Sequence, residues 1–239
     1  MVLFTTKKMN NPFLQIIESE AAFLQLALED VELSIKEVLD TKPDCRIALA
    51  GGNTPEPLYK AMAESKIPWE KIKLIQTDER YVPSDHKESN LGMLRRTLLN
   101  HIPLPPNNLL TFDTSLPLDS ASKEMSRKII ELSHDRFPIF DLLILGVGDD
   151  GHIASLFEGE DAMTSSYYAT PAIAKGYETE QRLTLSLISL RNSARALILL
   201  KGAKKLKIWD ALHGKNSDLQ LTALQVLIQK MPVKVLYLP

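Results

Sequence analysis

The 239-residue sequence contains a single cysteine, Cys45, which excludes an internal disulfide. Disulfides are rare in the reducing cytoplasm, so this composition agrees with a cytoplasmic protein. We expect Cys45 to lie on a buried strand. No apolar run approaches membrane-spanning length, and the first lysines follow a very short apolar run, which is the wrong order for a secretory signal. We therefore expect a cytoplasmic protein that does not bind membranes.

Net charge is almost absent as well, because 28 basic side chains are balanced by 30 acidic ones. This balance gives no electrostatic case for binding nucleic acid, so any anionic ligand must be held by a few local cations. We also find no linker, internal repeat or low-complexity tract in the sequence. Since 44% of the residues are hydrophobic, an ordinary share for a globular protein, we expect one domain spanning residues 1–239.

Short apolar runs alternate with amphipathic stretches along most of the chain. Between Ser19 and Leu39 the apolar residues recur at steps of three and four, which predicts a long helix with Ser19 as its N-cap. Thr54 is expected to cap a second helix that begins at Pro55. Further helices are predicted near 90–99, 122–133, 203–212 and 222–229, and strands at 45–50, 72–77, 141–145, 182–187, 196–200 and 233–238. This alternation is typical of a three-layer α/β/α sandwich with a mainly parallel, Rossmann-like sheet.

In sheets of this kind, ligands bind beyond the carboxyl ends of the strands, and three loops at such ends have unusual residues. The first, AGGNTP, joins Gly51 and Gly52 to a helix N-terminus. The glycines allow close approach of a ligand, and the free N–H groups of the helix can form a phosphate cradle with the Thr54 hydroxyl. A tight turn with Thr54 as an ordinary cap explains this loop about equally well.

The second loop, residues 77–90, places Asp78, Glu79 and Arg80 directly after a predicted strand. Two carboxylates beside a guanidinium can orient a substrate and neutralise developing negative charge. Three charges in a polar loop are, by themselves, more often a solvated cluster. Ser89 and Asn90 are expected to cap the helix that follows.

The third loop, LGVGDDGHIASLF, has the G-x-G-x-x-G spacing of dinucleotide-binding turns. Asp149 and Asp150 lie where such a turn receives a pyrophosphate, so they argue against a nicotinamide or flavin cofactor. His152 is instead expected to accept a proton near neutral pH, with Asp150 orienting its ring, although a lone histidine is more often structural. No spacing typical of metal ligands is present, and Ser155 lacks the G-x-S-x-G of serine nucleophiles.

Cations that could meet an anionic ligand come later in the chain. Arg182 opens a predicted strand, and Lys204 and Lys205 closely follow another. All three lie near strand ends, although each lysine alone is more often a solvated helix residue.

Together, these stretches resemble the 6-phosphogluconolactonase family over nearly the whole chain. The resemblance rests on GGNTPEPLY, DERYVP with SN downstream, LGVGDDGHIASLF, RLTLSL and GAKK, in the family's order and spacing. It implies the sugar-phosphate isomerase-like fold shared with glucosamine-6-phosphate deaminases. It also implies hydrolysis of 6-phospho-D-glucono-1,5-lactone, the second step of the oxidative pentose phosphate pathway, with the lactone as the partner and neither a metal nor an organic cofactor.

The same resemblance implies roles for individual residues. His152 falls on the family's histidine, beside Asp150, and would be the base that deprotonates water. Arg80 would orient the sugar and stabilise the carbonyl oxygen as it gains charge. The positions implied for substrate and phosphate binding are Gly51, Gly52, Asn53, Thr54, Asp78, Arg182 and Lys205. Glu158 and the C-terminal VLYLP depart from the family's pattern at positions peripheral to this chemistry.

Two other functions stay open from the sequence. Deaminases or isomerases of the same fold share the G-G turn, the D-E pair and the D-G-H. They usually have D-E-Y and continue into F-N-E-P, where this chain has Arg80 and HIASLF. A non-enzymatic sugar-phosphate sensor would need a DNA-binding segment, and none is recognisable in the sequence.

Overall fold

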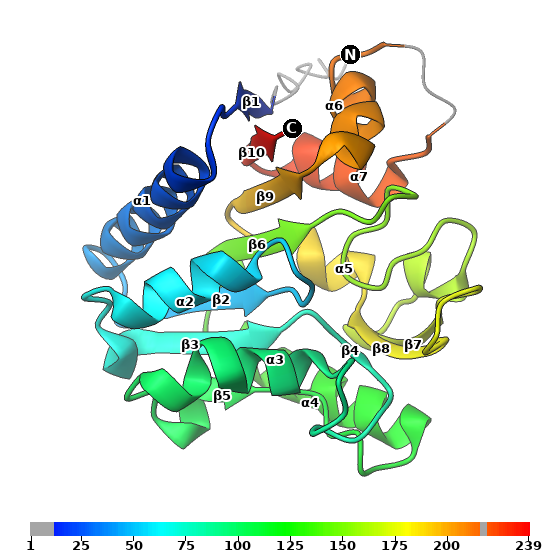
Figure 1. Cartoon of the computed structure of the whole chain (residues 1–239). Helices are drawn as coiled ribbons and strands as arrows, with labels where there is room; N and C mark the ends of the chain where they lie inside the picture. The colour runs from blue at the N-terminus through cyan, green and yellow to red at the C-terminus, as the bar shows by residue number, and fades with distance from the viewer. Residues whose placement is uncertain (1–11, 216–218) are drawn as a thin grey trace, which may run out of the picture.

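The computed structural model describes residues 12–215 and 219–239, which include a sheet of seven parallel strands flanked by helices (Figure 1). From edge to edge the strands are β1 (Phe13–Ile16), β10 (Val233–Leu238), β9 (Ala196–Lys201), β6 (Leu142–Gly146), β2 (Cys45–Leu49), β3 (Ile72–Gln76) and β5 (Leu109–Leu110). Every pairing in this sheet is parallel. The predicted α/β fold is therefore confirmed, and Cys45 is buried on β2 as expected.

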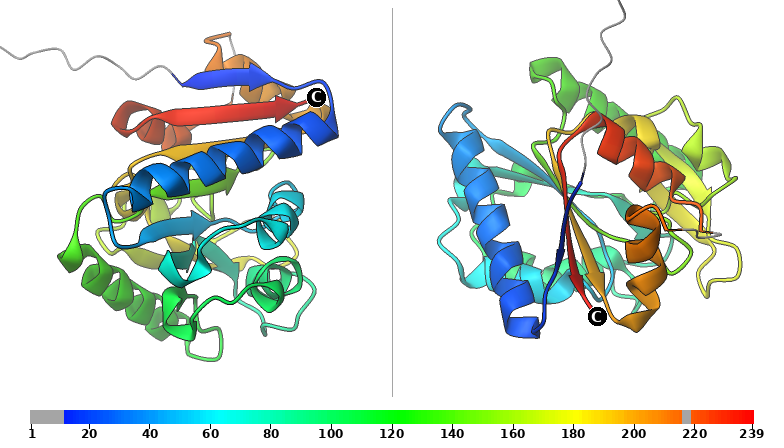
Figure 2. Two further views of the ribbon diagram at one scale, coloured as in Figure 1. Left: turned by 90° about the vertical axis from the view of Figure 1, so that its left-hand side faces the viewer. Right: turned by 90° about the horizontal axis from the view of Figure 1, so that it is seen from above.

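Helices cover both faces of this sheet (Figure 2). One face carries α1 (Glu20–Leu39), α2 (Glu56–Glu64) and α3 (Asn90–Thr97), and the other carries α4 (Leu118–Asp135), α5 (Leu187–Leu190), α6 (Leu206–Leu212) and α7 (Thr222–Lys230). Side chains alternate between the two faces along each strand. On β2, Ile47 and Leu49 pack with the first group of helices and Ala48 with the second. The sheet is thus the middle of three layers, and within the described ranges no helix is long and apolar enough to cross a membrane.

Most predicted helices form close to their expected ends. The Ser19 hydroxyl caps α1 by accepting a hydrogen bond from the N–H of Ala22 at 3.3 Å. The prediction that Thr54 caps α2 is wrong, because Pro55 has a helical conformation and itself occupies the N-cap position. The helices predicted at 203–212 and 222–229 form as α6 and α7, except that the first three residues of the former are a 3₁₀ turn. The 3₁₀ turns are η1 (Trp69–Lys71), η2 (Leu99–His101), η3 (Pro106–Asn108), η4 (Asp161–Met163) and η5 (Ala203–Lys205).

A second, antiparallel sheet was not predicted. In the described part of the chain it consists of β4 (Asp78–Arg80), β8 (Gln181–Leu185) and β7 (Ala169–Ile173). The loop expected from residue 78 therefore begins with a strand, and the strand expected at 182–187 pairs here instead of in the main sheet. The turn joining β7 to β8, residues 174–180, is too short for the crossover that a parallel pair needs. Both sheets share a core, since Leu183 and Leu185 pack in one hydrophobic cluster with Leu143.

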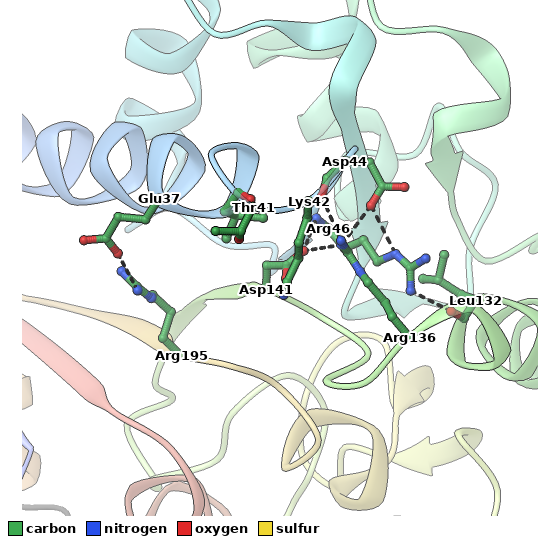
Figure 3. A network of polar contacts seen from close by, with 10 residues as sticks. Glu37, Thr41, Lys42, Asp44, Arg46, Leu132, Arg136, Asp141 and Arg195 are labelled. Atoms are coloured by element: carbon green, nitrogen blue, oxygen red, sulfur yellow. Dashed lines mark hydrogen bonds and ion pairs between the residues drawn. The ribbon is translucent and has the colours of Figure 1, made fainter.

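An ionic network around the buried carboxylate of Asp141 lies at the amino ends of β2 and β6 (Figure 3). The Asp141 carboxylate accepts hydrogen bonds from Lys42 Nζ at 2.7 Å, from the backbone N–H of Arg46 at 2.8 Å and from the Arg136 guanidinium at 2.5 Å. The Arg136 guanidinium also lies 2.8 Å from the carboxylate of Asp44. Because ligands in such sheets bind at the carboxyl ends of strands, this network is at the end opposite to the expected site.

Candidate active site

The loops that follow β2, β3 and β6 meet at one edge of the main sheet, because these strands are parallel neighbours in register. They border a pocket of about 270 Å³. Asp150 and Lys205 do not line this pocket, although Asp150 contacts a residue that does. The predicted site residues that line it come from four separate stretches of chain: Gly51, Gly52, Asn53, Thr54, Asp78, Arg80, His152 and Arg182.

His152 and Asp150 form a hydrogen-bonded pair at the edge of this pocket. The Nδ1 atom of His152 lies 2.5 Å from Oδ1 of Asp150, and the backbone N–H of His152 donates to the same oxygen at 3.2 Å. Burial acts to raise the pKa of Asp150, but the hydrogen bond and charge of His152 outweigh it and lower this pKa to about 2. An ionised carboxylate at Nδ1 fixes the proton there, so Nε2 of the neutral ring is the nitrogen left to accept a proton.

Gly148 provides the space that the His152 ring occupies. A Cβ atom at position 148 would lie 2.1 Å from ring atoms of His152 and 2.6 Å from Oδ1 of Asp150. The backbone N–H of Gly148 also donates to the carbonyl of His152 at 2.8 Å, which closes the turn. The glycine spacing that resembles a dinucleotide-binding turn therefore serves, at this position, to seat an imidazole against the backbone.

Arg80 and Arg182 lie side by side on adjacent strands of the second sheet. They are directly opposite partners on β4 and β8, so both side chains lie on the same face, and both line the pocket. Arg182 is only 5% exposed, and burial followed by the charge of Arg80 lowers its pKa. Asp78 and Glu88 partly offset this effect. Repulsion between two neighbouring guanidiniums makes this wall of the pocket a favourable place for an anion.

Asp78 connects the second loop to the third. Its carboxylate accepts hydrogen bonds from the hydroxyl of Thr77 at 2.9 Å and from the hydroxyl of Ser155 at 2.8 Å. The backbone N–H of Ser155 in turn donates to the hydroxyl of Thr184 on β8 at 3.2 Å. Ser155 thus holds two loops together.

Glu79 stabilises a helix instead of lining the pocket, so the two carboxylates of the second loop have separate roles. Its buried carboxylate accepts hydrogen bonds at the N-terminus of α3, where Ser89 is the N-cap, as predicted. Burial raises the pKa of Glu79, and hydrogen bonds from the backbone act in the opposite direction. The donors, at 2.7 to 3.2 Å, are the Gln76 amide, the Ser89 hydroxyl and the N–H groups of Arg80, Asn90 and Leu91.

Asn90 fixes the glycine turn of the first loop against the second loop. Its side-chain nitrogen donates to the carbonyl of Asp78 at 2.9 Å, and its amide oxygen lies against Gly51, where an added Cβ would be 1.9 Å away. Gly51 is therefore required for this close approach. Gly52 has a φ of +94°, in the region that favours glycine.

Lys205 lies outside the pocket, where it forms an ion pair with Asp149. Hydrogen bonding to Lys205 lowers the pKa of Asp149. The structure therefore does not place Lys205 with the two arginines, and its implied role in phosphate binding stays a prediction.

Two aromatic residues of the pocket were missed by sequence reasoning. Phe157 lies in the third loop, and Tyr177 lies in the turn between β7 and β8. Their rings are 4.3 Å and 6.0 Å from the ring of His152, between centroids. Phe157 is in the HIASLF stretch, five residues after His152, so the sequence could have indicated it as a residue of the pocket. No sequence feature near Tyr177 marks its turn as part of a site. In the described residues, no group of three or more histidine, cysteine or acidic side chains is arranged to hold a metal ion.

Comparisons with known proteins show which family the chain belongs to. The family model described as glucosamine-6-phosphate isomerases/6-phosphogluconolactonase matches residues 18–234. The chain is 35% identical over 219 residues to a 6-phosphogluconolactonase from Synechocystis sp., covering 87% of this chain and 88% of that protein. It is 34% identical over 187 residues to a 6-phosphogluconolactonase from Thermotoga maritima, covering 78% and 83%. A crystal structure of 6-phosphogluconolactonase from Thermotoga maritima superposes with a TM-score of 0.82 at 29% identity, covering 95% of this chain and 99% of that one.

Proposed function

The chain belongs to the family of glucosamine-6-phosphate isomerases and 6-phosphogluconolactonases, and we propose that it hydrolyses 6-phospho-D-glucono-1,5-lactone to 6-phospho-D-gluconate. The observation that carries this proposal is the pairing of His152 with Asp150 beside a pocket that also holds Arg80 and Arg182. A phosphorylated lactone needs a base for water and cations for its phosphate and its developing oxyanion. This pocket provides both.

The reaction needs no covalent intermediate, because a lactone is an activated ester. His152 takes a proton from water through Nε2 while Asp150 stabilises the imidazolium, and the resulting hydroxide attacks the carbonyl carbon C1. Arg80 stabilises the oxyanion that forms on the carbonyl oxygen. Collapse of this intermediate breaks the bond from C1 to the ring oxygen, which takes the proton back from His152 and becomes the C5 hydroxyl of the product.

The phosphate would be held away from the reacting carbon, by Arg182 and the turn formed by residues 51–54. Backbone N–H groups at the start of α2 and the exposed part of this turn favour an anion. Lys205 could contribute if it exchanged its ion pair with Asp149 for one with the phosphate. Fixing the phosphate orients the lactone ring, so binding energy far from C1 is used to position the reacting atoms.

The alternatives are a deaminase or isomerase acting on an amino-sugar phosphate, and a non-enzymatic sensor. The matched family model covers both isomerases and lactonases, so family membership does not separate them. Arg80 and the HIASLF stretch favour the lactonase, as do the relatives named above. Location in the cytoplasm, the single domain over residues 1–239, the independence from cofactors and the lack of nucleic-acid or membrane partners stay predictions.

The decisive measurement is hydrolysis of freshly prepared 6-phosphogluconolactone, with the spontaneous rate subtracted. We expect a clear enzymatic increment and no release of ammonia from glucosamine 6-phosphate. Ammonia release without a lactonase increment would establish the deaminase instead, and binding of sugar phosphates with neither activity would favour the sensor.

The His152→Ala variant tests the proposed base. We expect kcat to fall by roughly 10²–10⁴-fold, the usual effect of losing a general base, while 6-phosphogluconate still binds in calorimetry. The matched control is His134→Ala, because His134 is exposed on α4 and lines no part of this pocket. A folded His152→Ala protein with the kcat of the wild type would overturn this assignment.

A further inference from the structure

Tyr177 contacts both of the groups that the proposed reaction uses at opposite ends of the substrate. The guanidinium carbon of Arg182 is over its ring, 5.7 Å from the centroid. The same ring meets that of His152 edge to face, at 6.0 Å and 88°. A lactone held by its phosphate near Arg182, with C1 near His152, must therefore pass beside this ring.

The Tyr177 ring is also part of a wall between two hollows. His152, Phe157 and Tyr177 line both the pocket described above and a second hollow of about 240 Å³. The charged residues of the second hollow are mostly acidic: Asp150, Glu158 and Glu160, with Lys175. A dianionic phosphate is repelled from this second hollow and attracted to the two arginines of the pocket. Charge therefore favours binding of the substrate in the pocket and not in the second hollow.

The turn that carries Tyr177 is held in place at several points. The hydroxyl of Thr179 donates to the carboxylate of Glu88, and the Nε–H of Arg182 donates to the carbonyl of Thr179 at 2.7 Å. Lys175 forms an ion pair with Glu160 at 2.7 Å. Tyr177 is nevertheless 41% exposed, so its ring can be reached by a ligand. Burial, and then the charge of Asp150, raise the pKa of Tyr177, so its hydroxyl stays neutral.

We propose that Tyr177 is a substrate-contacting residue whose ring packs against the apolar face of the lactone ring and thereby selects cyclic over open-chain sugar phosphates. This inference rests on the proposed function for the position of the substrate. The C–H groups on one face of a pyranose-like ring form a flat apolar surface, and an aromatic ring buries such a surface with little loss of conformational entropy. The open-chain product has no such surface, so the same contact favours substrate over product.

Binding measurements test the contact without requiring catalysis. The two probes are 1,5-anhydroglucitol 6-phosphate, which is cyclic, and glucitol 6-phosphate, which is its open-chain counterpart, each titrated by calorimetry. We expect Tyr177→Ala to weaken binding of the cyclic probe by about tenfold and to change binding of the open-chain probe by less than about twofold. Tyr177→Phe keeps the ring and should bind both probes like the wild type. Tyr167→Ala, which removes an exposed tyrosine that lines neither hollow, is the control.

Three results would overturn the proposal. Equal weakening of both probes in Tyr177→Ala would show that the ring acts on the phosphate through Arg182. A loss in Tyr177→Phe as large as in Tyr177→Ala would assign the effect to the hydroxyl. Unchanged binding of the cyclic probe would exclude a contact altogether. A wild-type protein that prefers the cyclic probe but lacks lactonase activity would contradict the proposed function while leaving Tyr177 in its role.

Discussion

Gly148 determines where the proposed base lies. Nothing larger than a hydrogen fits at its Cα, because the rest of the space is filled by the ring of His152 and the carboxylate of Asp150. The site thus depends on a residue that takes no part in the chemistry. The same is true of Gly51, whose neighbour is the amide of Asn90.

Replacing Gly148 with alanine should therefore impair catalysis more than binding. The new methyl group would displace the His152 ring, and a displacement of about 1 Å can cost roughly 10²-fold in rate. We expect that loss in kcat, with binding of 6-phosphogluconate largely kept. Gly146→Ala is the control for folding, because no atom lies within 4 Å of a Cβ there, and its unfolding midpoint should match that of the wild type. A normal kcat in Gly148→Ala would mean that the ring does not need its present position.

Asp150 should contribute to stability in a defined range of pH. Its pKa in the folded protein is about 2, below the ordinary value of 3.8, so the carboxylate is stabilised in its ionised form by folding. That contribution is complete above about pH 5 and is lost as the pH falls toward 2. Denaturant unfolding at several pH values from about 5 downward should show a difference between wild type and Asp150→Asn that shrinks as the pH falls toward 2. A difference independent of pH would contradict the pairing with His152.

At the scale of the element, the N-terminus of α3 links the main sheet to the second sheet. Glu79 on β4 accepts hydrogen bonds from the N–H groups in the first turn of this helix. Asn90, in the same turn, donates to the carbonyl of Asp78 and packs against Gly51 in the turn after β2. Two loops of the pocket are therefore positioned by one helix end. A change there should affect stability first and the pocket second.

Glu79→Gln should destabilise the protein although it keeps the shape of the side chain. Both carboxylate oxygens accept from two or more donors, so an amide nitrogen at either position would face N–H groups. Leaving such donors unpaired in the interior costs about 1–3 kcal/mol of unfolding free energy. Glu64→Gln, at an exposed position on α2, should change it by less than about 0.5 kcal/mol, and denaturant titration of both variants measures the contrast.

The long elements could be predicted from the sequence, and the second sheet could not. Apolar spacing identified α1 from Ser19 onward, because periodicity over five turns is a strong signal. The strand Asp78–Arg80 has only three residues and all are charged, and β7 contains Pro171, so neither shows the alternation of a strand. Pocket residues reached through the second sheet, such as Tyr177, were missed for the same reason. The pairing of Lys205 with Asp149 depends on side-chain geometry that spacing does not show.

At the scale of the whole molecule, the pocket and the ionic network around Asp141 lie at opposite ends of the same strands. The network joins β2 and β6 through Asp141, while the pocket lies beyond their other ends. Stability and catalysis should therefore respond to separate substitutions. This separation can be tested at Asp141, whose hydrogen bonds and ion pairs in the described structure involve no residue of the pocket.

Asp141→Asn should lower the unfolding free energy by about 2–4 kcal/mol, since it removes the charge of a buried carboxylate that accepts hydrogen bonds from Lys42, Arg136 and the backbone N–H of Arg46. Well below the unfolding temperature, kcat and KM for the lactone should stay at wild-type values. Glu56→Gln is the control, because its ion pair with Lys60 is largely exposed and should contribute less than about 0.5 kcal/mol. A large change in KM with Asp141→Asn would show that the two ends of the sheet are coupled.

The order of the strands also has a consequence for synthesis. The strand β1 pairs with β10 alone in the described structure, and β10 follows every other described element in the chain. While the ribosome is still making the protein, Phe13–Ile16 has no partner, and β9 has one of its edges open. The central strands β3, β2 and β6 can associate earlier. Phe13 and Ile16, which stay more than half exposed in the finished fold, therefore belong to a strand whose edge stays open until Val233–Leu238 has been synthesised.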